Sequence, residues 1–413
     1  MSDKYQAWKR GNLVVLDEHS RAKHEILRNY VEMYIQTLCK RHGMTEFKIT
    51  LIDGFAGGGR YEGGEPGSPL VLLEAVEMAE AKINECREKK IIIKGNYYFI
   101  EEDKNTFNLL LKTLQESRYQ NEIDKTIFIK NSRFNENVSH IVEDIRKRSP
   151  RSEGRALFFL DQTGYSAVHP KTIRDIRKTL PSAEFVITIS TDWLIDFIGH
   201  DCVEENLKKL ELDQYFDIKE LVRLRKEKQV DWRYVIEAKL SVAWRQATGV
   251  SYFRPFFIEP NYNHRGYWLL HLSSHPKAHD VMTDIHWEKG NYFRHYGGGR
   301  GLDIFGYKPN FNLELPGISF NDTFRQQNEK ALLEDLPPLI HEYRENGILF
   351  EKLVDKNRNI KAVSNRIVKE VLLELWKDKE IEILGPQGGQ KRSDTSLNKN
   401  DIILPLIQRK LKF

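Results

Sequence analysis

Cysteine is scarce in this chain, since its 413 residues include only Cys39, Cys86 and Cys202. No two of them form a CxxC pair from which a zinc or iron–sulfur site could start, so we expect free thiols and no metal site. Long apolar runs are also missing, and no window approaches the roughly 18 consecutive apolar residues of a membrane helix. The N-terminal segment MSDKYQAWKRGN lacks the apolar core of a signal peptide. We therefore expect a cytoplasmic protein without a membrane partner.

Charge of one sign is not strongly in excess. The net charge is +4, and 40% hydrophobic with 30% charged residues is typical of a folded protein. Residues 351–413 alone carry 14 Lys/Arg against 9 Asp/Glu, so the basic surplus lies in this C-terminal segment. Basic clustering of this kind is typical of a surface that meets an anionic partner.

Apolar and amphipathic segments alternate through the first half of the chain. Residues 21–41 place apolar side chains at helical spacing. Ser68 followed by Pro69 predicts a helix start with serine as the cap, and helical stretches follow the later strands. The predicted strands are 48–53, 96–102, 126–130, 156–161 and 184–190. This alternation predicts βαβ units and a parallel sheet.

The pattern changes after about residue 200. Residues 201–250 are charged and mostly helical in pattern, whereas 253–260 and 266–274 have the composition of two strands joined as a hairpin. Such a hairpin would close the parallel sheet with an antiparallel pair. Residues 291–320 are rich in Gly, Tyr and Asn and are expected to form a loop. We therefore expect a first domain at 1–320 that contains a helical insertion.

Residues 321–413 are expected to form a separate C-terminal region. Helices are predicted at 320–336, 337–346 and 363–380, followed by a strand, the glycine-rich turn GPQGGQKR and a last strand at 401–406. This is the order of elements in a winged helix, in which Lys391 and Arg392 of the turn would meet the phosphates of nucleic acid. A plain helical cap with a C-terminal hairpin is the alternative.

The stretch LIDGFAGGGRYEGG, residues 51–64, joins a strand to a glycine-rich turn. It lacks the Lys-Ser/Thr of a phosphate-binding GxxxxGK[ST] loop, and it does not open directly into a helix as a dinucleotide-binding GxGxxG does. An acid at the end of the first strand, a glycine turn and a second acid at the end of the next strand are instead the layout of an S-adenosylmethionine site. The stretch therefore predicts S-adenosylmethionine as the cofactor.

Several blocks of the sequence resemble known proteins. DGFAGGG is similar to the D-x-F-x-G-x-G motif of nucleic-acid methyltransferases. Together with the preceding Lys- and His-containing helix, the blocks GSP, FIEED, FLDQTGYSAV and YWLLHLSSHPKAHDVM resemble the three-Cys-motif partner family of bacterial proteins. The resemblance runs from about residue 20 to the end. It implies a Rossmann-like methyltransferase fold and a protein partner that carries a three-cysteine motif.

Four candidate cofactor-binding residues lie in or beside the glycine stretch. Asp53 would order the turn near the amino-acid part of the cofactor, or it could simply form the turn. Phe55 would either contact the cofactor or pack the turn. Gly57 and Gly59 would supply a positive φ angle or a close backbone approach.

Two more candidates follow the next strands. Glu101 is expected at a strand end, where one carboxylate can accept hydrogen bonds from both ribose hydroxyls, and we prefer it to Glu102. Asn131 or Ser132 would contact the adenine edge, although capping of the next helix explains either residue equally well.

The turn Asp161-Gln162-Thr163-Gly164-Tyr165 follows the fourth strand, where methyltransferases that act on exocyclic amines carry an acid or Asn followed by Pro-Pro-aromatic. The family that the chain resembles usually has a form like Asp-Pro-Tyr-Gly here. Asp161 would orient the methyl acceptor and Tyr165 would stack on it, so both are candidate catalytic residues. The missing proline predicts a looser turn and weak activity on nucleobase amines without the partner.

These features predict an S-adenosylmethionine-dependent methyltransferase that acts on or near nucleic acid, with a Rossmann-like α/β sheet and a winged-helix-like α+β C-terminal region. The alternative is an adaptor module that binds the cofactor but has lost catalysis. A nuclease is disfavoured, because no stretch presents acids clustered with a lysine convincingly. The sequence leaves the acceptor open among DNA, RNA, protein and small molecules.

Overall fold

The computed structural model of the protein describes residues 10–41, 43–148, 155–215, 217–227, 232–258, 267–289, 293–295, 318–319, 322–355, 363–389 and 397–406. The chain divides into two compact units, Met1–Ile285 and His286–Phe413. The domain boundary expected at 320 stays a prediction, since most residues from 290 to 321 lie outside the described ranges.

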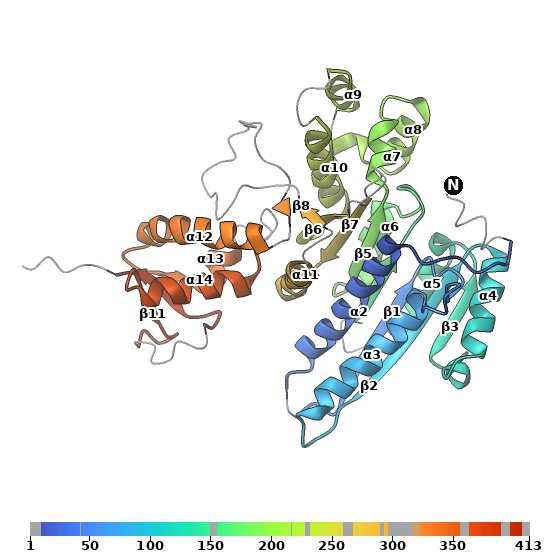
Figure 1. The fold of residues 1–413 in the computed structure, drawn as a ribbon, viewed down its shortest axis with the longest axis horizontal. Helices are drawn as coiled ribbons and strands as arrows, with labels where there is room; N and C mark the ends of the chain where they lie inside the picture. Colours follow the sequence, from blue (N-terminus) through green and yellow to red (C-terminus); the bar gives the residue numbers. More distant parts are fainter. Residues whose placement is uncertain are drawn as a thin grey trace, which may run out of the picture. The chain divides into compact units, whose positions relative to one another are not determined.

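A parallel sheet closed by an antiparallel hairpin forms the centre of the first unit (Figure 1). Its strands lie in the order β3-β2-β1-β4-β5-β7-β6. Strands β1 to β5 are parallel to one another, and β7 runs antiparallel to β5 and β6. The bounds are β1 Glu46–Asp53, β2 Ile92–Glu101, β3 Ile127–Asn131, β4 Ala156–Leu160, β5 Glu184–Ile189, β6 Tyr252–Ile258 and β7 Tyr267–Ser273. The predicted fold class, a Rossmann-like methyltransferase sheet, is confirmed.

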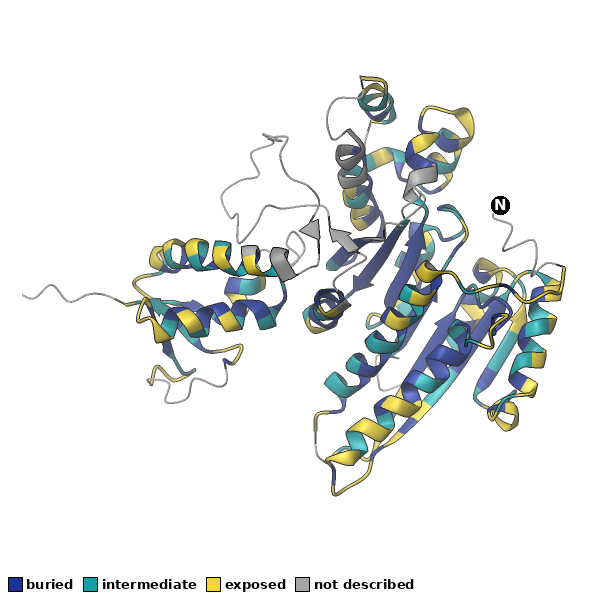
Figure 2. Cartoon of the chain, viewed as in Figure 1, coloured by how far each residue is buried: buried dark blue, intermediate teal, exposed yellow. Residues whose placement is uncertain are grey.

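The central strands are apolar because they are covered on both faces. Every residue of β4 and of β5 is buried, and Figure 2 shows these strands in the dark blue of buried residues. Continuous apolar runs are typical of parallel strands between helices. Glu184 and Thr188 of β5 are the polar exceptions, and the Glu184 carboxylate accepts a hydrogen bond from the Tyr30 hydroxyl.

Helices flank the sheet of the first unit. α2 and α3 run side by side across one face (Figure 1), while α5 packs on α6 and α6 packs on α10. The segment predicted to be helical at 201–250 forms α8 to α10. The bounds are α2 Glu18–Leu38, α3 Ser68–Glu85, α4 Lys104–Gln115, α5 Phe134–Arg148, α6 Pro170–Thr179, α7 Thr191–Asp196, α8 Asp201–Lys209, α9 Ile218–Glu227, α10 Trp232–Thr248 and α11 Pro276–Lys289. Single 3₁₀ turns lie at Gln120–Glu122 and Asp213–Tyr215.

The start of α3 differs from the prediction in one detail. Gly67, not Ser68, occupies the N-cap position, and no side chain caps this helix end. Ser68 is the first helical residue, and its hydroxyl hydrogen-bonds to Asp53 instead. The glycine turn before the helix places Gly67 beside Gly59, whose carbonyl accepts a hydrogen bond from the Gly67 N–H at 2.8 Å. Because this contact fixes Gly67, the N-cap lies one residue earlier than predicted.

The second unit contains a winged helix. Its elements follow the order helix, strand, helix, helix, strand, strand, and β12 pairs antiparallel with both β10 and β11. The bounds are α12 Asp322–Glu342, β10 Ile348–Leu349, α13 Phe350–Asp355, α14 Asn365–Lys377, β11 Ile381–Leu384 and β12 Ile402–Pro405. Two short strands, β8 Phe293–His295 and β9 Ile318–Ser319, pair antiparallel with each other. The wing lies between β11 and β12, but Lys391 and Arg392 lie outside the described residues.

The predicted break between two helices at Pro337-Pro338 is wrong, because α12 continues through both prolines. An interior proline removes a backbone hydrogen bond and costs about 3 kcal/mol. The apolar stripe of the helix continues on either side of the prolines, and its side chains are buried in the core of the unit. These residues are Leu332, Leu336, Leu339 and Ile340. Their burial compensates for the lost hydrogen bonds.

Candidate functional site

One cavity of about 790 Å³ opens at the carboxyl ends of the parallel strands in the first unit. Residues directly after β1, β3 and β4 line it together with the last residue of β2: Gly54, Ser132, Asp161 and Glu101. The sheet order reverses between β1 and β4, and open parallel sheets bind ligands at such a switch point. The volume falls within the range of small-molecule pockets.

The glycine turn has the backbone that the sequence predicted. Gly57 has a φ of 61° and Gly59 a φ of 77°, in the left-handed region that only glycine enters easily. A Cβ on Gly59 would lie 2.9 Å from Leu110 Cδ1, so the position excludes any larger residue without rearrangement. Both glycines line the cavity, which brings the backbone of the turn within reach of a ligand.

Glu101 closes the turn from the neighbouring strand. Its Oε2 accepts a hydrogen bond from the Gly57 N–H at 3.0 Å, and its Oε1 accepts one from the Asp103 N–H at 2.9 Å. Partial burial raises the pKa of Glu101, and the two N–H donors oppose that rise. Each carboxylate oxygen keeps a second lone pair, so Glu101 can still accept hydrogen bonds from a ligand in the cavity.

Asp53 lies beneath the turn and is not part of the cavity wall. It is 1% exposed; its Oδ1 accepts a hydrogen bond from the Phe55 N–H at 3.1 Å, whereas its Oδ2 is buried without a partner. Burial raises the pKa of Asp53 to about 7, although hydrogen bonds from Ser68 and Phe55 lower it and the charges of Asp161 and Glu101 raise it. Phe55 itself lines the cavity.

Asn131 does not reach the cavity. Its side-chain amide donates hydrogen bonds to the carbonyl oxygens of Glu101 and Glu102, at 2.9 and 3.0 Å, and thereby ties β3 to β2. The next residues, Ser132 and Arg133, line the cavity instead. Arg133 pairs with Glu102 through its Nε at 2.7 Å. The alternative residue considered for this position, Ser132, is thus better placed than Asn131.

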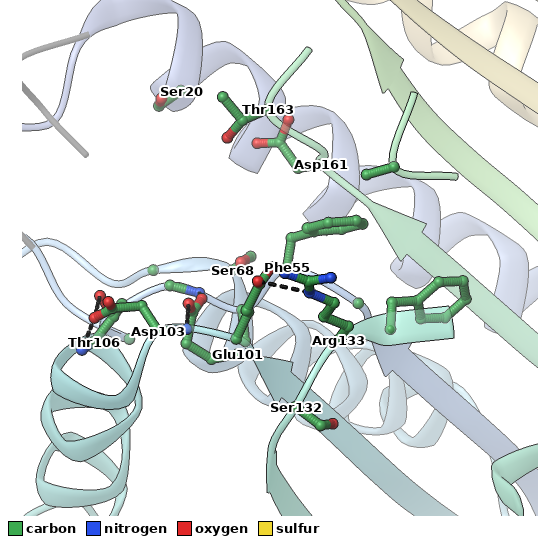
Figure 3. A pocket seen from close by; sticks show the side chains of 18 of the residues that line it. Ser20, Phe55, Ser68, Glu101, Asp103, Thr106, Ser132, Arg133, Asp161 and Thr163 are labelled. Carbon is green, nitrogen blue, oxygen red and sulfur yellow. Dashed lines mark hydrogen bonds and ion pairs between the residues drawn. The ribbon is translucent and has the colours of Figure 1, made fainter. Parts of the chain in front are cut away.

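Asp161 lies on the opposite side of the cavity from Glu101 (Figure 3). Its Oδ2 accepts a hydrogen bond from Lys23 Nζ at 2.5 Å, and its side chain is 43% exposed while that of Lys23 is 14% exposed. Burial would raise the pKa of Asp161, but the Lys23 ammonium, the Thr188 hydroxyl and the charge of His24 outweigh burial and lower it. Asp161 is therefore held as a carboxylate.

Tyr165 is not placed to stack on a ligand in this cavity. It is 3% exposed, is absent from the cavity wall, and its hydroxyl accepts a hydrogen bond from Asn206 of α8 at 3.2 Å. Gly164, with a φ of 95°, turns the chain before it. Thr163 and Ser166 contribute to the wall instead, so the turn offers hydroxyl groups where the sequence suggested an aromatic ring.

The turn after Asp161 is held by Gln162. The side chain is 2% exposed, and its Oε1 accepts hydrogen bonds from the N–H groups of Ala167 and Val168, at 2.8 and 2.9 Å. A third hydrogen bond joins the same turn to α5, since Asn135 Nδ2 donates to the Ala167 carbonyl at 2.8 Å. The looseness expected from the missing proline is therefore not seen.

The sequence did not identify the contribution of α2 to the cavity. Ser20, Lys23 and His24 all line it, and Figure 3 shows Ser20 on the same side as Asp161 and Thr163. Lys23 Nζ also lies 5.2 Å from the centroid of the Tyr267 ring. The available signal was the Lys-His pair in an amphipathic helix before the glycine stretch, but nothing in its spacing connects it with Asp161.

Comparison with known proteins gives a family for part of the second unit. The family model of the GMT-like wHTH domain, a winged helix-turn-helix, matches residues 306–388. This match agrees with the order of elements from α12 to β11. The resemblance to the three-Cys-motif partner family stays a prediction, because the matching model describes a different domain and covers only this segment.

Solved structures similar to this chain are distant. Protein LPL1258 from Legionella pneumophila has 10% identity and a TM-score of 0.31, with 60% of this chain and 84% of that chain covered. A "putative S-adenosyl-L-methionine-dependent methyltransferase" from Methanococcus maripaludis has 13% identity and a TM-score of 0.26, with 62% and 92% covered. Both scores are too low to bear on function. A search of curated proteins finds no match.

The chain thus combines an α/β unit, whose strands β1 to β5 are parallel, with a winged helix. No helix of the described residues is long and apolar enough to cross a membrane.

Proposed function

We propose that this protein is an S-adenosylmethionine-dependent methyltransferase that acts on nucleic acid. The observation that carries the proposal is the cavity itself, in which the glycine turn and Glu101 form one side and the Lys23–Asp161 ion pair forms the other. A methyl donor and a methyl acceptor have to meet in one enclosed space, and the two sides supply separate binding surfaces for them.

The residues on the glycine side fit S-adenosylmethionine. Glu101 would accept hydrogen bonds from the ribose hydroxyls, and the backbone at Gly57 and Gly59 would lie against the amino-acid part of the cofactor. Asp53, with an Oδ2 that lacks a partner, would add negative charge beneath the turn for a cationic ligand. Ser132, which the sequence offered as an alternative to Asn131, would contact the adenine edge.

When bound, S-adenosylmethionine supplies an electrophilic methyl group, so the protein has to position the acceptor and remove a proton where necessary. Asp161, held as a carboxylate by Lys23, accepts a hydrogen bond from an N–H or O–H group of the acceptor. The Thr163 and Ser166 side chains border the same part of the cavity. The aromatic ring of Phe55 adds apolar surface to the cavity wall.

The acceptor atom is best assigned as nitrogen or oxygen. Methylation at a nucleobase carbon through a covalent intermediate needs an enzyme nucleophile such as a thiolate. None of the described residues that line the cavity is a cysteine, and burial raises the pKa of the Cys39 thiol to about 11. An acceptor that is itself nucleophilic therefore suits this cavity.

The winged helix supports nucleic acid as the substrate, since this domain type commonly places a helix or wing against a duplex. Lys391 and Arg392 would contact phosphates from the wing. A partner with a three-cysteine motif, implied by the family resemblance, would act with the chain on that substrate. The alternative, an adaptor that binds the cofactor without turnover, predicts cofactor affinity with no methyl transfer.

Binding and transfer assays test the proposal. Calorimetry should detect S-adenosylmethionine or its demethylated product, and Glu101→Ala should weaken binding by about 1.5–3 kcal/mol, the value of a hydrogen bond to a charged group. Glu88→Gln, an exposed acid outside the cavity, is the control. Transfer of radiolabelled methyl groups to DNA, RNA and the partner protein then separates enzyme from adaptor. Absence of cofactor binding would contradict both.

A further inference from the structure

We infer that Lys23 and Gln162 are positioning residues that together present the Asp161 carboxylate to the methyl acceptor. The inference rests on the proposed function and identifies how this chain replaces the proline of the usual motif. Lys23 reaches Asp161 from α2, across 138 residues of sequence, and Gln162 acts from within the turn.

Lys23 fixes one oxygen of the carboxylate. The bond from Nζ to Oδ2 is 2.5 Å long, and Lys23 is largely buried while Asp161 is 43% exposed. The exposed part of Asp161 belongs to the cavity wall. A carboxylate has about four acceptor positions, and Lys23 and Thr188 account for two of them. The remaining positions serve a donor on the acceptor molecule.

Gln162 fixes the backbone that carries Asp161. Its Oε1 accepts from two successive N–H groups, those of Ala167 and Val168, and so closes the loop from residue 162 to residue 168. Two N–H donors also establish that the oxygen, not the nitrogen, of the amide faces them. Proline would restrict the same turn through φ alone. Gln162 restricts it through hydrogen bonds across the turn, which is why Asp161 can keep its place without proline.

The charged and titratable groups around Asp161 come from three elements. Lys23 and His24 belong to α2, Asp53 ends β1, and Tyr267 belongs to β7. Burial raises the pKa of Asp161, and the charge of Lys23 is the largest influence that lowers it. Removal of its charge leaves burial with less opposition, so the pKa of Asp161 should rise.

A measurement that needs no activity tests the ion pair. The protein is labelled with ¹³Cγ-aspartate, and the Asp161 resonance is assigned by its loss in Asp161→Asn. In Lys23→Met the pKa of Asp161 should rise by about 1–3, the usual effect of an opposite charge at this distance, and Lys23→Arg should restore a low value. Arg28→Met is the matched control, since Arg28 lies on α2 like Lys23 but pairs with Glu74 of α3, outside the cavity. An unchanged pKa in Lys23→Met would overturn the role of Lys23.

The pH profile of methyl transfer tests positioning. The probe is a mixed-sequence duplex DNA or a structured RNA. In Lys23→Met the acid limb of the plot of kcat against pH should shift to higher pH by the same amount, about 1–3 pH units. Cofactor affinity should stay within about twofold, because Lys23 is not assigned to the cofactor side. A profile that stays in place while the NMR pKa moves would show that Lys23 is only structural. If the unaltered protein binds no cofactor and transfers no methyl group, the proposed function fails, whatever the NMR result.

Gln162→Met tests the turn. Methionine keeps the length of the side chain but accepts only weakly, so the Ala167 and Val168 amides should exchange hydrogen at least about tenfold faster. The value of kcat should fall with little change in cofactor affinity, which a general loss of folding would not produce. Amides of β4 report on folding of the variant. Fast exchange at Ala167 and Val168 with kcat unchanged would overturn the role of Gln162.

Discussion

Asp53→Asn tests whether the carboxylate beneath the glycine turn is energetically strained. Asp53 is 1% exposed, and its Oδ2 has no hydrogen-bond partner. Burial raises its pKa from 3.8 to about 7. The folded protein therefore binds this proton more tightly than the unfolded chain does. The stabilisation that results is complete below about pH 4 and is lost as the pH rises through about 7.

The magnitude follows from the pKa values of Asp53 in the folded and unfolded states. A pKa difference of one between the two states corresponds to about 1.4 kcal/mol, so ionisation of Asp53 lowers the free energy of unfolding by about 2–3 kcal/mol between pH 5 and pH 8. Asparagine does not ionise, so the free energy of unfolding of Asp53→Asn minus that of the unaltered protein should rise by this amount over the same range. An amide nitrogen left without an acceptor would change all values equally.

Urea unfolding followed by circular dichroism, at pH 5, 6, 7 and 8, measures this difference. Glu88→Gln, an exposed acid beyond the end of α3, controls for the loss of a carboxylate. A difference between Asp53→Asn and the unaltered protein that stays constant with pH would refute the reasoning, because Asp53 would then titrate alike in the folded and unfolded states. A falling difference would mean that the pKa of Asp53 is lowered.

Three further changes have defined outcomes. Gly59→Ala should reduce cofactor affinity at least about tenfold in calorimetry, because the new Cβ meets Leu110 at 2.9 Å and the φ of 77° is strained for alanine. Tyr30→Phe should lower the free energy of unfolding by about 1–3 kcal/mol in urea titrations, because Glu184 and His271 lose a buried partner. Reversal of charge at Lys391 and Arg392 should reduce the slope of the logarithm of the duplex-binding constant against the logarithm of the salt concentration. The reduction should equal the loss of about two phosphate contacts, measured by fluorescence anisotropy.

The sheet and the glycine turn were predictable because their signals lie in consecutive residues. The segment ending at Asp53 is an apolar run followed at once by glycines, and Glu101 stands at the end of the next apolar run. In the structure these two strands pair in parallel, with Asp53 opposite Phe99. Adjacent parallel strands bring their carboxyl ends to one edge, so a local pattern was enough to place Glu101 beside the turn.

Two site residues that were predicted only from their position at or after a strand end in the sequence do not line the cavity. Tyr165 was selected because it follows Asp161 closely, yet the backbone bends at Gly164 and the ring is buried towards Asn206. Asn131 was selected at the end of its strand, yet its amide bonds neighbouring carbonyls and only Ser132 reaches the cavity. The direction of a side chain in a turn depends on φ and ψ angles that composition does not reveal.

The part played by α2 follows from the hairpin that closes the sheet. The Tyr30 hydroxyl hydrogen-bonds to Glu184 of β5 and lies 2.8 Å from His271 Nε2 of β7, so α2 is fixed to two strands that are antiparallel neighbours. Lys23 precedes Tyr30 by seven residues, two turns of helix, and therefore lies on the same face. The contact that anchors the helix thus also directs Lys23 towards Asp161. A helix from outside the βαβ core becomes part of the cavity because the last strands hold it there, and this dependence on distant pairing is what a single sequence does not show.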